Sequence, residues 1–497
     1  MMDQLLECLA GWKPFRAVVL GDFMLDELVS GDAERLSADA PVPVLRVRSS
    51  KQTPGGAANV CLDLAALKGE VEAVGVVGAD SAGEALRQAL RAAGVGAEGV
   101  VEDASRPTTR KQNLIGLAQA RHPQKMFRVD YESREPLSGE MQERLAEVMR
   151  ARIEAADVVV IEDYAKGVCT PELCQRVIEM ARRAGKPVFV DPARGADYAA
   201  YRGASAITPN RTEAEEAAGL ATDEHARVDR NAEIAKLLLE RLGLEACVLT
   251  LDRHGALLLE RGGAPTAVPT CARQVYDVTG AGDMFIAGLA AARANGASWT
   301  DSVRLANAAA GLEVEVFGVQ PIPLERVHHA VMTLAAPTRG KVRTAAQVMV
   351  EVAARRAQGE RIVFTNGCFD VLHSGHVSLL EQAAGLGDFL VVGLNDDDSV
   401  RRLKGPTRPV NGLEERARVL GAVAGVGAIV PFSEDTPVRL IEAVRPDTLV
   451  KGADYTKDKV VGSSLVESYG GRVVLVDVVA GRSTTATLAR VRASDGG

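Results

Sequence analysis

The sequence has few cysteines, and their spacing excludes two kinds of site. Seven cysteines are spread over 497 residues, and no two of them form a Cys-x-x-Cys pair. Disulfide frameworks and structural zinc sites need cysteines at short, regular spacings, so we expect neither in this chain. Unpaired thiols are typical of a reducing compartment, which favours a cytoplasmic location.

The sequence also lacks a long apolar run and an excess of positive charge. No stretch approaches the roughly 20 apolar residues of a membrane-spanning helix, and residues 1–20 lack the basic start and apolar core of a secretion signal. The formal net charge of -8 would repel a nucleic acid duplex. We therefore expect neither nucleic acid nor a membrane among the partners.

What the sequence does contain is a regular alternation that is typical of α/β proteins. Short β-branched runs are separated by longer stretches rich in alanine and leucine, which predicts parallel sheets flanked by helices. The expected buried strands include residues 16–21, 157–161, 188–190 and 247–251. Ligands of such sheets bind in the loops beyond the strand ends.

The length of the chain and a break in the alternation predict two domains. A chain of 497 residues is too long for one core, and the pattern is interrupted near residues 335–341. A helix at 345–357 and a new strand at 361–365 are expected next. We therefore predict two α/β domains, a large one with a lid at residues 1–337 and a smaller, doubly wound one at 345–497.

The strongest glycine-rich element lies at residues 277–283, directly before an expected helix at 284–294. Its turn consists of Gly280, Ala281 and Gly282. Backbone N–H groups at such a turn, together with the helix dipole, can hold a phosphate and stabilise negative charge that develops on it. Asp283 is then placed as a general base toward a substrate hydroxyl. A tight turn with a capping acid is the structural alternative, which this motif alone leaves open.

Two further elements precede this turn in the chain. Gly55 and Gly56 allow close approach of a ligand to the backbone, and Asn59 can bond sugar hydroxyls. Asn210 and Glu213 are three residues apart at an expected helix start, where they could organise a hydrated Mg²⁺ beside ATP phosphates. Helix packing and helix capping are the structural alternatives, and both remain open.

In their order along the chain and in their residues, the three elements resemble motifs of the ribokinase-like (phosphofructokinase-B) family. The resemblance implies that ATP phosphorylates a sugar hydroxyl with Mg²⁺. The same resemblance implies that residues 55–59 bind the sugar, residues 210–213 serve the metal and the nucleotide, and residues 277–283 carry out catalysis. It also implies an adenine-nucleotide surround at Thr250, Asp252, Gly255 and Asn307. Such kinases often pair through a lid sheet, so a homodimer is expected. Arg110 and Lys111, on an expected lid strand, could hold a phosphate of the substrate or simply face solvent.

The expected second domain opens with a histidine-containing turn. Residues 364–376 predict a strand, a turn and a helix start, and His373 and His376 share one helix face because they are three residues apart. Imidazole N–H groups there can stabilise charge on an α-phosphate and on the leaving pyrophosphate. Two histidines could instead begin a zinc site, but no third ligand follows at a suitable spacing.

Two later segments of the sequence could also bind phosphate groups. Lys404 and Arg408 lie in a basic glycine loop and could neutralise a triphosphate or a sugar phosphate. Hydroxyl groups that could bond phosphate precede the last expected helix, at Ser483, Thr484 and Thr485. A solvated loop and a helix cap are the structural alternatives.

Together these segments resemble the cytidylyltransferase-like family. The resemblance implies a Rossmann-like nucleotidyltransferase domain in which the two histidines are catalytic. A substrate phosphate oxygen would attack the nucleotide α-phosphorus directly, with Mg²⁺ and without a covalent intermediate. The resemblance also places Asn366, Phe369 and Asp454 near the nucleotide.

The order of the two families in one chain carries a further resemblance. Together with residues 35–44 and 402–411, it is similar to bifunctional heptose enzymes of lipopolysaccharide-core synthesis. This implies phosphorylation of heptose 7-phosphate at C1, and transfer of AMP from ATP to heptose 1-phosphate. Glu162 departs from that pattern, because serine is expected there. Another sugar or polyol phosphate, another nucleotide, or a sensor with one inactive half remains open.

Overall fold

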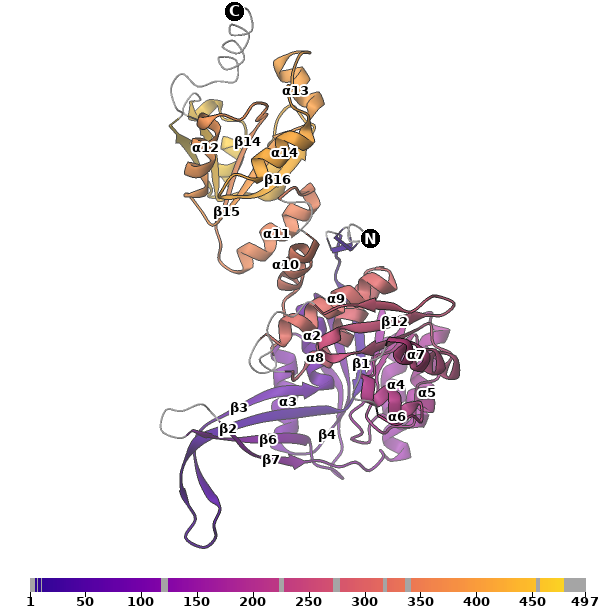
Figure 1. Cartoon of the computed structure of the whole chain (residues 1–497). Coiled ribbons are helices and arrows are strands. Elements are labelled where there is room, and N and C mark those ends of the chain that lie inside the picture. Colours follow the sequence, from indigo (N-terminus) through magenta and orange to yellow (C-terminus); the bar gives the residue numbers. More distant parts are fainter. Residues whose placement is uncertain are drawn as a thin grey trace, which may run out of the picture. The chain divides into compact units, whose positions relative to one another are not determined.

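The computed structural model describes residues 5–6, 8–9, 11–117, 124–222, 228–270, 278–315, 320–335, 341–452 and 456–477 (Figure 1). The chain divides into two compact units, Trp12–Val327, and Met1–Gly11 with His328–Gly497. We refer to them as the larger and the smaller unit. The predicted domain limits, 1–337 and 345–497, stay a prediction.

A nine-stranded sheet forms the centre of the larger unit, as far as its residues are described. Its strand order is β13-β12-β11-β10-β9-β8-β1-β4-β5, parallel from β5 to β11 and antiparallel at β12 and β13. The strands are β1 (Phe15–Gly21), β4 (Gly69–Val77), β5 (Gly96–Glu102), β8 (Val158–Glu162), β9 (Val188–Asp191), β10 (Ala206–Ile207), β11 (Ala246–Thr250), β12 (Ala256–Glu260) and β13 (Thr266–Val268). The four strands expected from the sequence are confirmed as β1, β8, β9 and β11.

Helices cover the sheet of the larger unit. They are α2 (Ala57–Ala66), α3 (Ser81–Ala92), α4 (Gly139–Ile153), α5 (Pro171–Arg183), α6 (Arg211–Ala217), α7 (Val228–Leu242), α8 (Ala281–Ala294) and α9 (Trp299–Glu313), and α10 (Leu324–Ala335) follows. The core packs Leu145 of α4 and Val177 of α5 against Val159 and Ile161 of β8. Thr170 caps α5 by accepting a hydrogen bond from the Leu173 N–H.

A second, four-stranded sheet, which we call the lid sheet, projects from the nine-stranded sheet (Figure 1). Its order is β3-β2-β6-β7, with β2 (Phe23–Leu36), β3 (Pro43–Gly56), β6 (Thr109–Leu117) and β7 (Gln124–Tyr131). β2 follows β1 after a single residue, and β3 leads directly into α2, so the chain passes from the main sheet to the lid sheet and back. The predicted lid strand with Arg110 and Lys111 is β6.

The smaller unit contains a five-stranded parallel sheet in the order β16-β15-β14-β17-β18. The strands are β14 (Ile362–Gly367), β15 (Phe389–Asn395), β16 (Val426–Phe432), β17 (Thr448–Gly452) and β18 (Arg472–Val476), and the helices are α11 (Ala345–Ala357), α12 (Ser374–Ala384), α13 (Asp397–Lys404), α14 (Leu413–Gly421), α15 (Val438–Val444) and α16 (Ser463–Ser468). Phe364 packs with Val348 of α11 on one face, and Val363 packs with Leu380 of α12 on the other. The predicted Rossmann-like fold is therefore confirmed.

The strand order of the smaller unit also predicts where its ligand binds. β14 lies in the middle, and its successors β15 and β17 lie on opposite sides of it. Ligands of open α/β sheets bind at such a switch point, beyond the carboxyl ends of the strands. The histidine-containing turn follows β14 at that point. Among the described residues of the whole chain, every helix is too short or too polar to cross a bilayer.

Candidate active sites

The glycine turn of the larger unit lies at the N-terminus of α8, as predicted. Gly280 is the residue before the helix and has a φ of 88°, a left-handed conformation that glycine adopts without a Cβ clash. A Cβ atom at Gly280 would also lie only 2.5 Å from Glu313 Oε1. The first N–H groups of α8 have no partner within the helix, so the turn is suited to hold an anion.

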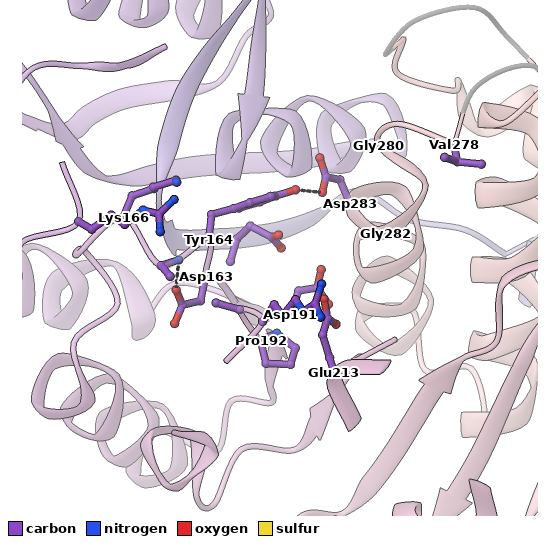
Figure 2. A pocket seen from close by; sticks show the side chains of 15 residues that line it. Asp163, Tyr164, Lys166, Asp191, Pro192, Glu213, Val278, Gly280, Gly282 and Asp283 are labelled. Atoms are coloured by element: carbon purple, nitrogen blue, oxygen red, sulfur yellow. Dashed lines mark hydrogen bonds between the residues drawn. The ribbon is translucent and has the colours of Figure 1, made fainter. Parts of the chain in front are cut away.

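Asp283, in the first turn of α8, is buried and held by two hydrogen bonds. Its Oδ2 accepts one from Asn59 Nδ2 at 2.9 Å. Its Oδ1 accepts the other from the Tyr164 hydroxyl at 2.8 Å, which Figure 2 shows. Burial raises the pKa of Asp283 to about 6, although both hydrogen bonds act in the opposite direction. Asp283 is therefore largely ionised at neutral pH and basic enough to accept a proton from a hydroxyl group.

Two cavities meet at Asp283. The large cavity has a volume of about 580 Å³ and the small cavity about 300 Å³. Tyr164, Gly280 and Asp283 line both. Asp283 can therefore reach a ligand in either cavity, as phosphoryl transfer between two bound substrates requires.

The small cavity brings together the first predicted element and the lid sheet. Gly55, Gly56 and Asn59 line it, and so does Lys111, whose Nζ lies 4.9 Å from the centre of the Tyr164 ring. Arg110 does not line it. Neighbouring residues of a strand point to opposite faces, and the Arg110 guanidinium lies 3.5 Å from Glu27 Oε2 and 4.1 Å from the Tyr131 ring centre.

Three basic residues of the small cavity were missed from the sequence. Lys51 of β3 and Lys125 and Arg128 of β7 line it beside Lys111. Lys125 and Arg128 are an odd number of positions apart and would point to opposite faces of a regular strand. A register shift opposite the Leu114/Ile115 step of β6 brings both to one face. Only the pairing of the strands reveals this arrangement.

Carboxylates at the ends of β8 and β9 line the large cavity (Figure 2). Asp163 Oδ2 accepts a hydrogen bond from the Tyr201 hydroxyl at 2.6 Å, and burial raises the Asp163 pKa to about 6. Asp191 Oδ1 accepts one from Thr208 at 2.7 Å. Burial, followed by nearby carboxylates, raises the pKa of Glu162 well above its usual range. The sequence marks Glu162 only as a departure from the pattern of the heptose enzymes, and it assigns no role to Asp163 or Asp191.

The loop after β8 is shaped by a buried acid that the sequence did not single out. Asp22, between β1 and β2, accepts hydrogen bonds at Oδ2 from the backbone N–H groups of Tyr164 at 2.8 Å and Lys166 at 3.0 Å. Its Oδ1 accepts a third from Val168 at 3.2 Å. Asp22 therefore fixes the backbone that presents the Tyr164 hydroxyl to Asp283.

Asn210 and Glu213 form a reciprocal capping box at the start of α6. Asn210 Oδ1 accepts from the Glu213 N–H at 3.0 Å, and Glu213 Oε2 accepts from the Asn210 N–H at 2.9 Å. The helix-capping role, which the sequence left open for these two residues, is therefore present. Glu213 also lines the large cavity, whereas Asn210 does not and instead lies beside Thr250 in a short parallel bridge.

The remaining residues of the predicted adenine-nucleotide surround lie around β11, β12 and β13. Asn307 Nδ2 donates to the Val268 carbonyl at 2.9 Å. Gly255 has a φ of 88°, and a Cβ atom there would lie 2.1 Å from the same carbonyl oxygen. Asp252 begins a 3-10 turn after β11. These three residues and Thr250 do not line either cavity.

The two predicted histidines of the smaller unit lie at the start of α12. Their rings are stacked with centroids 3.9 Å apart, and the Phe369 ring centroid is 5.2 Å from that of His376. Burial, and then the neighbouring His373, lower the pKa of His376 to about 4, so it is neutral at pH 7. Asn366, at the end of β14, has its carbonyl bonded by Lys451 Nζ at 2.9 Å, a contact that the sequence did not indicate.

The basic loop is tied to the histidine-containing turn. Arg408 forms an ion pair with Asp370, which also accepts hydrogen bonds from the N–H groups of Val410 and Asn411 at 2.6 and 3.1 Å. Lys404, at the end of α13, is exposed and acts electrostatically on the Cys368 thiol. Asp454, Ser483, Thr484 and Thr485 lie outside the described residues, so their roles stay predictions.

Arg416 is a residue of this site that the sequence did not reveal. Its fully buried guanidinium donates to the carbonyls of Cys368 at 2.7 Å, Asn395 at 2.8 Å and Asn411 at 3.0 Å, and to Asp397 Oδ1 at 2.6 Å. One side chain thus joins the histidine-containing turn, the end of β15, the start of α13 and the basic loop.

Comparison with known proteins agrees with both folds. The model of the pfkB family carbohydrate kinases matches residues 15–326, and the cytidylyltransferase-like model matches residues 364–487. Among solved structures, ribokinase from Arabidopsis thaliana complexed with ribose and ATP is 23% identical, covers 64% of this chain and 99% of its own, and has a TM-score of 0.51. Phosphofructokinase-2 from Escherichia coli in complex with substrates and products is 20% identical, with 65% and 100% coverage and a TM-score of 0.54. Both likenesses establish the fold of the larger unit.

Fold and sites therefore define a bifunctional transferase, a carbohydrate kinase joined to a nucleotidyltransferase. "Bifunctional protein HldE" of Geobacter sulfurreducens is 45% identical over 96% of this chain and 95% of its own, and that of Pelobacter propionicus is 44% identical over 95% of each. The chain belongs to this HldE family, and its activities are those of a heptose kinase and an adenylyltransferase. The larger unit is the kinase unit and the smaller one the transferase unit.

Proposed function

We propose that the kinase unit phosphorylates the anomeric hydroxyl of heptose 7-phosphate with ATP, and that the transferase unit adenylylates heptose 1-phosphate. The position of Asp283 between two cavities is the observation that carries the kinase half. Lys51, Lys111 and Lys125 line the small cavity, so a sugar that already bears a phosphate fits there better than a neutral one. The large cavity would then hold ATP.

In the kinase unit we assign Asp283 as the base. It accepts the proton of the sugar hydroxyl as the hydroxyl oxygen attacks the γ-phosphorus of ATP and the bond to ADP breaks. The N–H groups of Gly280, Ala281 and Gly282 stabilise the charge on the transferred group. Mg²⁺ supplies charge neutralisation for the nucleotide phosphates when bound, and Glu213 faces the large cavity where it would hold water of the hydrated ion.

In the transferase unit we assign His373 and His376 to the phosphates of ATP. A phosphate oxygen of heptose 1-phosphate attacks the α-phosphorus, and pyrophosphate leaves. Because His376 is neutral at pH 7, it can donate one N–H hydrogen bond without bringing a full positive charge into the pocket. Lys404 and Arg408 supply positive charge for the substrate phosphates instead.

The test is direct. The purified chain is incubated with ATP, Mg²⁺ and either heptose 7-phosphate or heptose 1-phosphate, and the products are separated by mass spectrometry. We expect heptose 1,7-bisphosphate in the first case and ADP-heptose with pyrophosphate in the second. Faster turnover of another sugar phosphate, or of CTP, would point to the other substrates that the motifs leave open. Absence of turnover in one half would point to a sensor.

We further propose a homodimer in the cytoplasm. Phe127, Val129 and Tyr131 of β7 lie on the lid-sheet face opposite the small cavity and are 60%, 37% and 42% exposed. Apolar patches of this kind often mark an interface. Light scattering should give twice the mass of one chain, and a Phe127→Ser, Tyr131→Ser variant should give one. The described cysteines are free thiols, which suits a reducing compartment and can be checked by cell fractionation.

A further inference from the structure

Two carboxylates at the floor of the large cavity come from neighbouring strands. Glu162 ends β8 and Asp191 ends β9, and the two residues are direct partners in the parallel register. Both line the large cavity. Side chains at adjacent positions of paired strands on the same face lie close enough to share one ligand.

Each carboxylate has one oxygen for which the described residues supply no hydrogen bond. Asp191 Oδ1 accepts the hydrogen bond from Thr208, and Oδ2 lies 3.6 Å from where a Cβ atom on Gly282 would be, directly beside the glycine turn. Glu162 is only 1% exposed, and its Oε2 accepts no hydrogen bond from any residue that the structure describes. A buried carboxylate oxygen without a donor is costly unless another positive group reaches it.

The charges that act most on Glu162 are all negative, and the cations that line the same cavity, Arg134, Lys166 and Arg194, are already paired with Glu132 or Glu216. Asp191 acts on it most strongly, followed by Asp283, Asp163 and Asp22. Asp22 and Asp163 already accept hydrogen bonds, and the Glu213 carboxylate is engaged in the capping box. Glu162, whose Oε2 accepts no hydrogen bond from a described residue, and its register partner Asp191, whose Oδ2 lies beside the glycine turn, are therefore the pair best placed to share a positive partner. A small divalent cation with oxygen ligands supplies one and keeps its remaining positions for water or phosphate oxygens.

We propose that Glu162 and Asp191 form a divalent-cation site that binds Mg²⁺ or Mn²⁺ in the large cavity without nucleotide. The ion would lie beside the glycine turn and neutralise phosphate charge there. This role rests on the kinase function proposed above, whereas binding of the ion does not.

The experiment uses Mn²⁺ as the probe and the full-length chain without ATP or sugar. Electron paramagnetic resonance of free Mn²⁺ gives the number and affinity of bound ions. We expect one tight Mn²⁺ in the wild type that Mg²⁺ displaces, its loss in Glu162→Gln, and at least a tenfold weaker affinity in Asp191→Asn. Glu143→Gln is the matched control, because Glu143 is exposed and paired with Arg176 in α5.

Folding and function are kept separate from binding in this design. Circular dichroism without metal establishes that each variant is folded, and the Mn²⁺-induced rise in Tm of the wild type, kept in Glu143→Gln and lost in Glu162→Gln, is a second readout. The proposal is overturned if the wild type binds no Mn²⁺ without nucleotide, or if folded Glu162→Gln binds it with unchanged stoichiometry and affinity. Either result leaves the outcome of the heptose assays untouched.

Discussion

At the scale of single residues, the kinase reaction depends on the ionisation of Asp283. Burial raises the pKa of this carboxyl to about 6, and only the ionised form can accept a proton. We therefore expect kcat/KM for the sugar to rise with pH through about 6 and to be lost below it. Steady-state rates from roughly pH 5 to 8 check this, and a constant rate through this range would contradict Asp283 as the base.

Tyr164→Phe should move that pH dependence upward. The Tyr164 hydroxyl donates to Asp283 and lowers its pKa, so its removal stabilises the protonated acid. A hydrogen bond to a charged group contributes about 1.5 kcal/mol, which corresponds to about one pH unit. The midpoint should shift from about 6 to about 7, with little loss of rate at high pH. An unchanged midpoint would show that this hydrogen bond does not tune the base.

His376 should titrate far below an ordinary histidine. Its pKa is lowered from 6.5 to about 4 by burial and by His373. The folded state favours the neutral form of His376. The resulting contribution of His376 to the free energy of unfolding is fully present above pH 6.5 and is lost as the pH falls through about 4. NMR of ¹³C-labelled histidine should show one imidazole still neutral at about pH 5.5, and that resonance should be missing in His376→Gln. Half-protonation near 6.5 would disprove the buried, stacked geometry.

At the scale of elements, substitutions on the two faces of the lid sheet should have different effects on KM for the sugar phosphate. Lys125 lines the small cavity, whereas Arg110 does not line it and, as the strand neighbour of Lys111, points to the opposite face, where its guanidinium lies over the Tyr131 ring. Lys125→Met should raise KM for the sugar phosphate about tenfold, since loss of about 1.4 kcal/mol of binding is a factor of ten, and leave KM for ATP unchanged. Arg110→Met is the control on the opposite face and should change neither. Equal effects of both substitutions would mean that only the net charge of the sheet matters.

Arg416 should hold the elements of the transferase site together. Arg416→Met leaves three carbonyl groups and Asp397 without their donor, so we expect the transferase unit to lose about 3 kcal/mol of stability or more. Adenylyltransferase activity should then disappear at lower urea concentration, while kinase activity of the same protein serves as the internal reference. Arg418→Met, on the exposed side of α14, should leave the urea dependence unchanged.

The elements themselves could be predicted from the sequence because the information is local. Each predicted strand is a short β-branched run, and the turn before α8 is marked by Gly280, whose left-handed φ restricts the position to glycine. The histidine-containing turn is likewise contiguous. These features need no knowledge of which strand lies beside which.

The rest of both sites could not be predicted, because it depends on pairing between distant segments. The Glu162–Asp191 pair exists only because β8 lies next to β9, and the shared face of Lys125 and Arg128 depends on a register shift against β6. Arg416 reads as a surface residue of an amphipathic helix, and its burial follows from three carbonyl groups brought to it by separate loops. Sequence patterns do not indicate such contacts between segments that are far apart in the chain.

At the scale of the whole molecule, the described residues of each site come from one unit. Asp283, its hydrogen-bond partners and both cavities belong to residues 12–327, and the two histidines belong to residues 328–497. The nine- and four-stranded sheets belong to the first of these ranges and the five-stranded sheet to the second, and their core clusters share no residue. We therefore expect that chemistry at one site does not require an intact side chain at the other.

Single substitutions should accordingly separate the two activities. Asp283→Asn should lower heptose bisphosphate formation by roughly 100- to 10,000-fold, the usual contribution of a general base, and leave adenylyl transfer within about twofold of the wild type. His376→Ala should give the reverse pattern. Both rates are measured on the same preparation, so a poorly folded sample is recognised by loss of both activities together with a lowered Tm. If a well-folded variant of either residue lost both reactions, the two sites would have to be coupled, and the separation of the units would not extend to their chemistry.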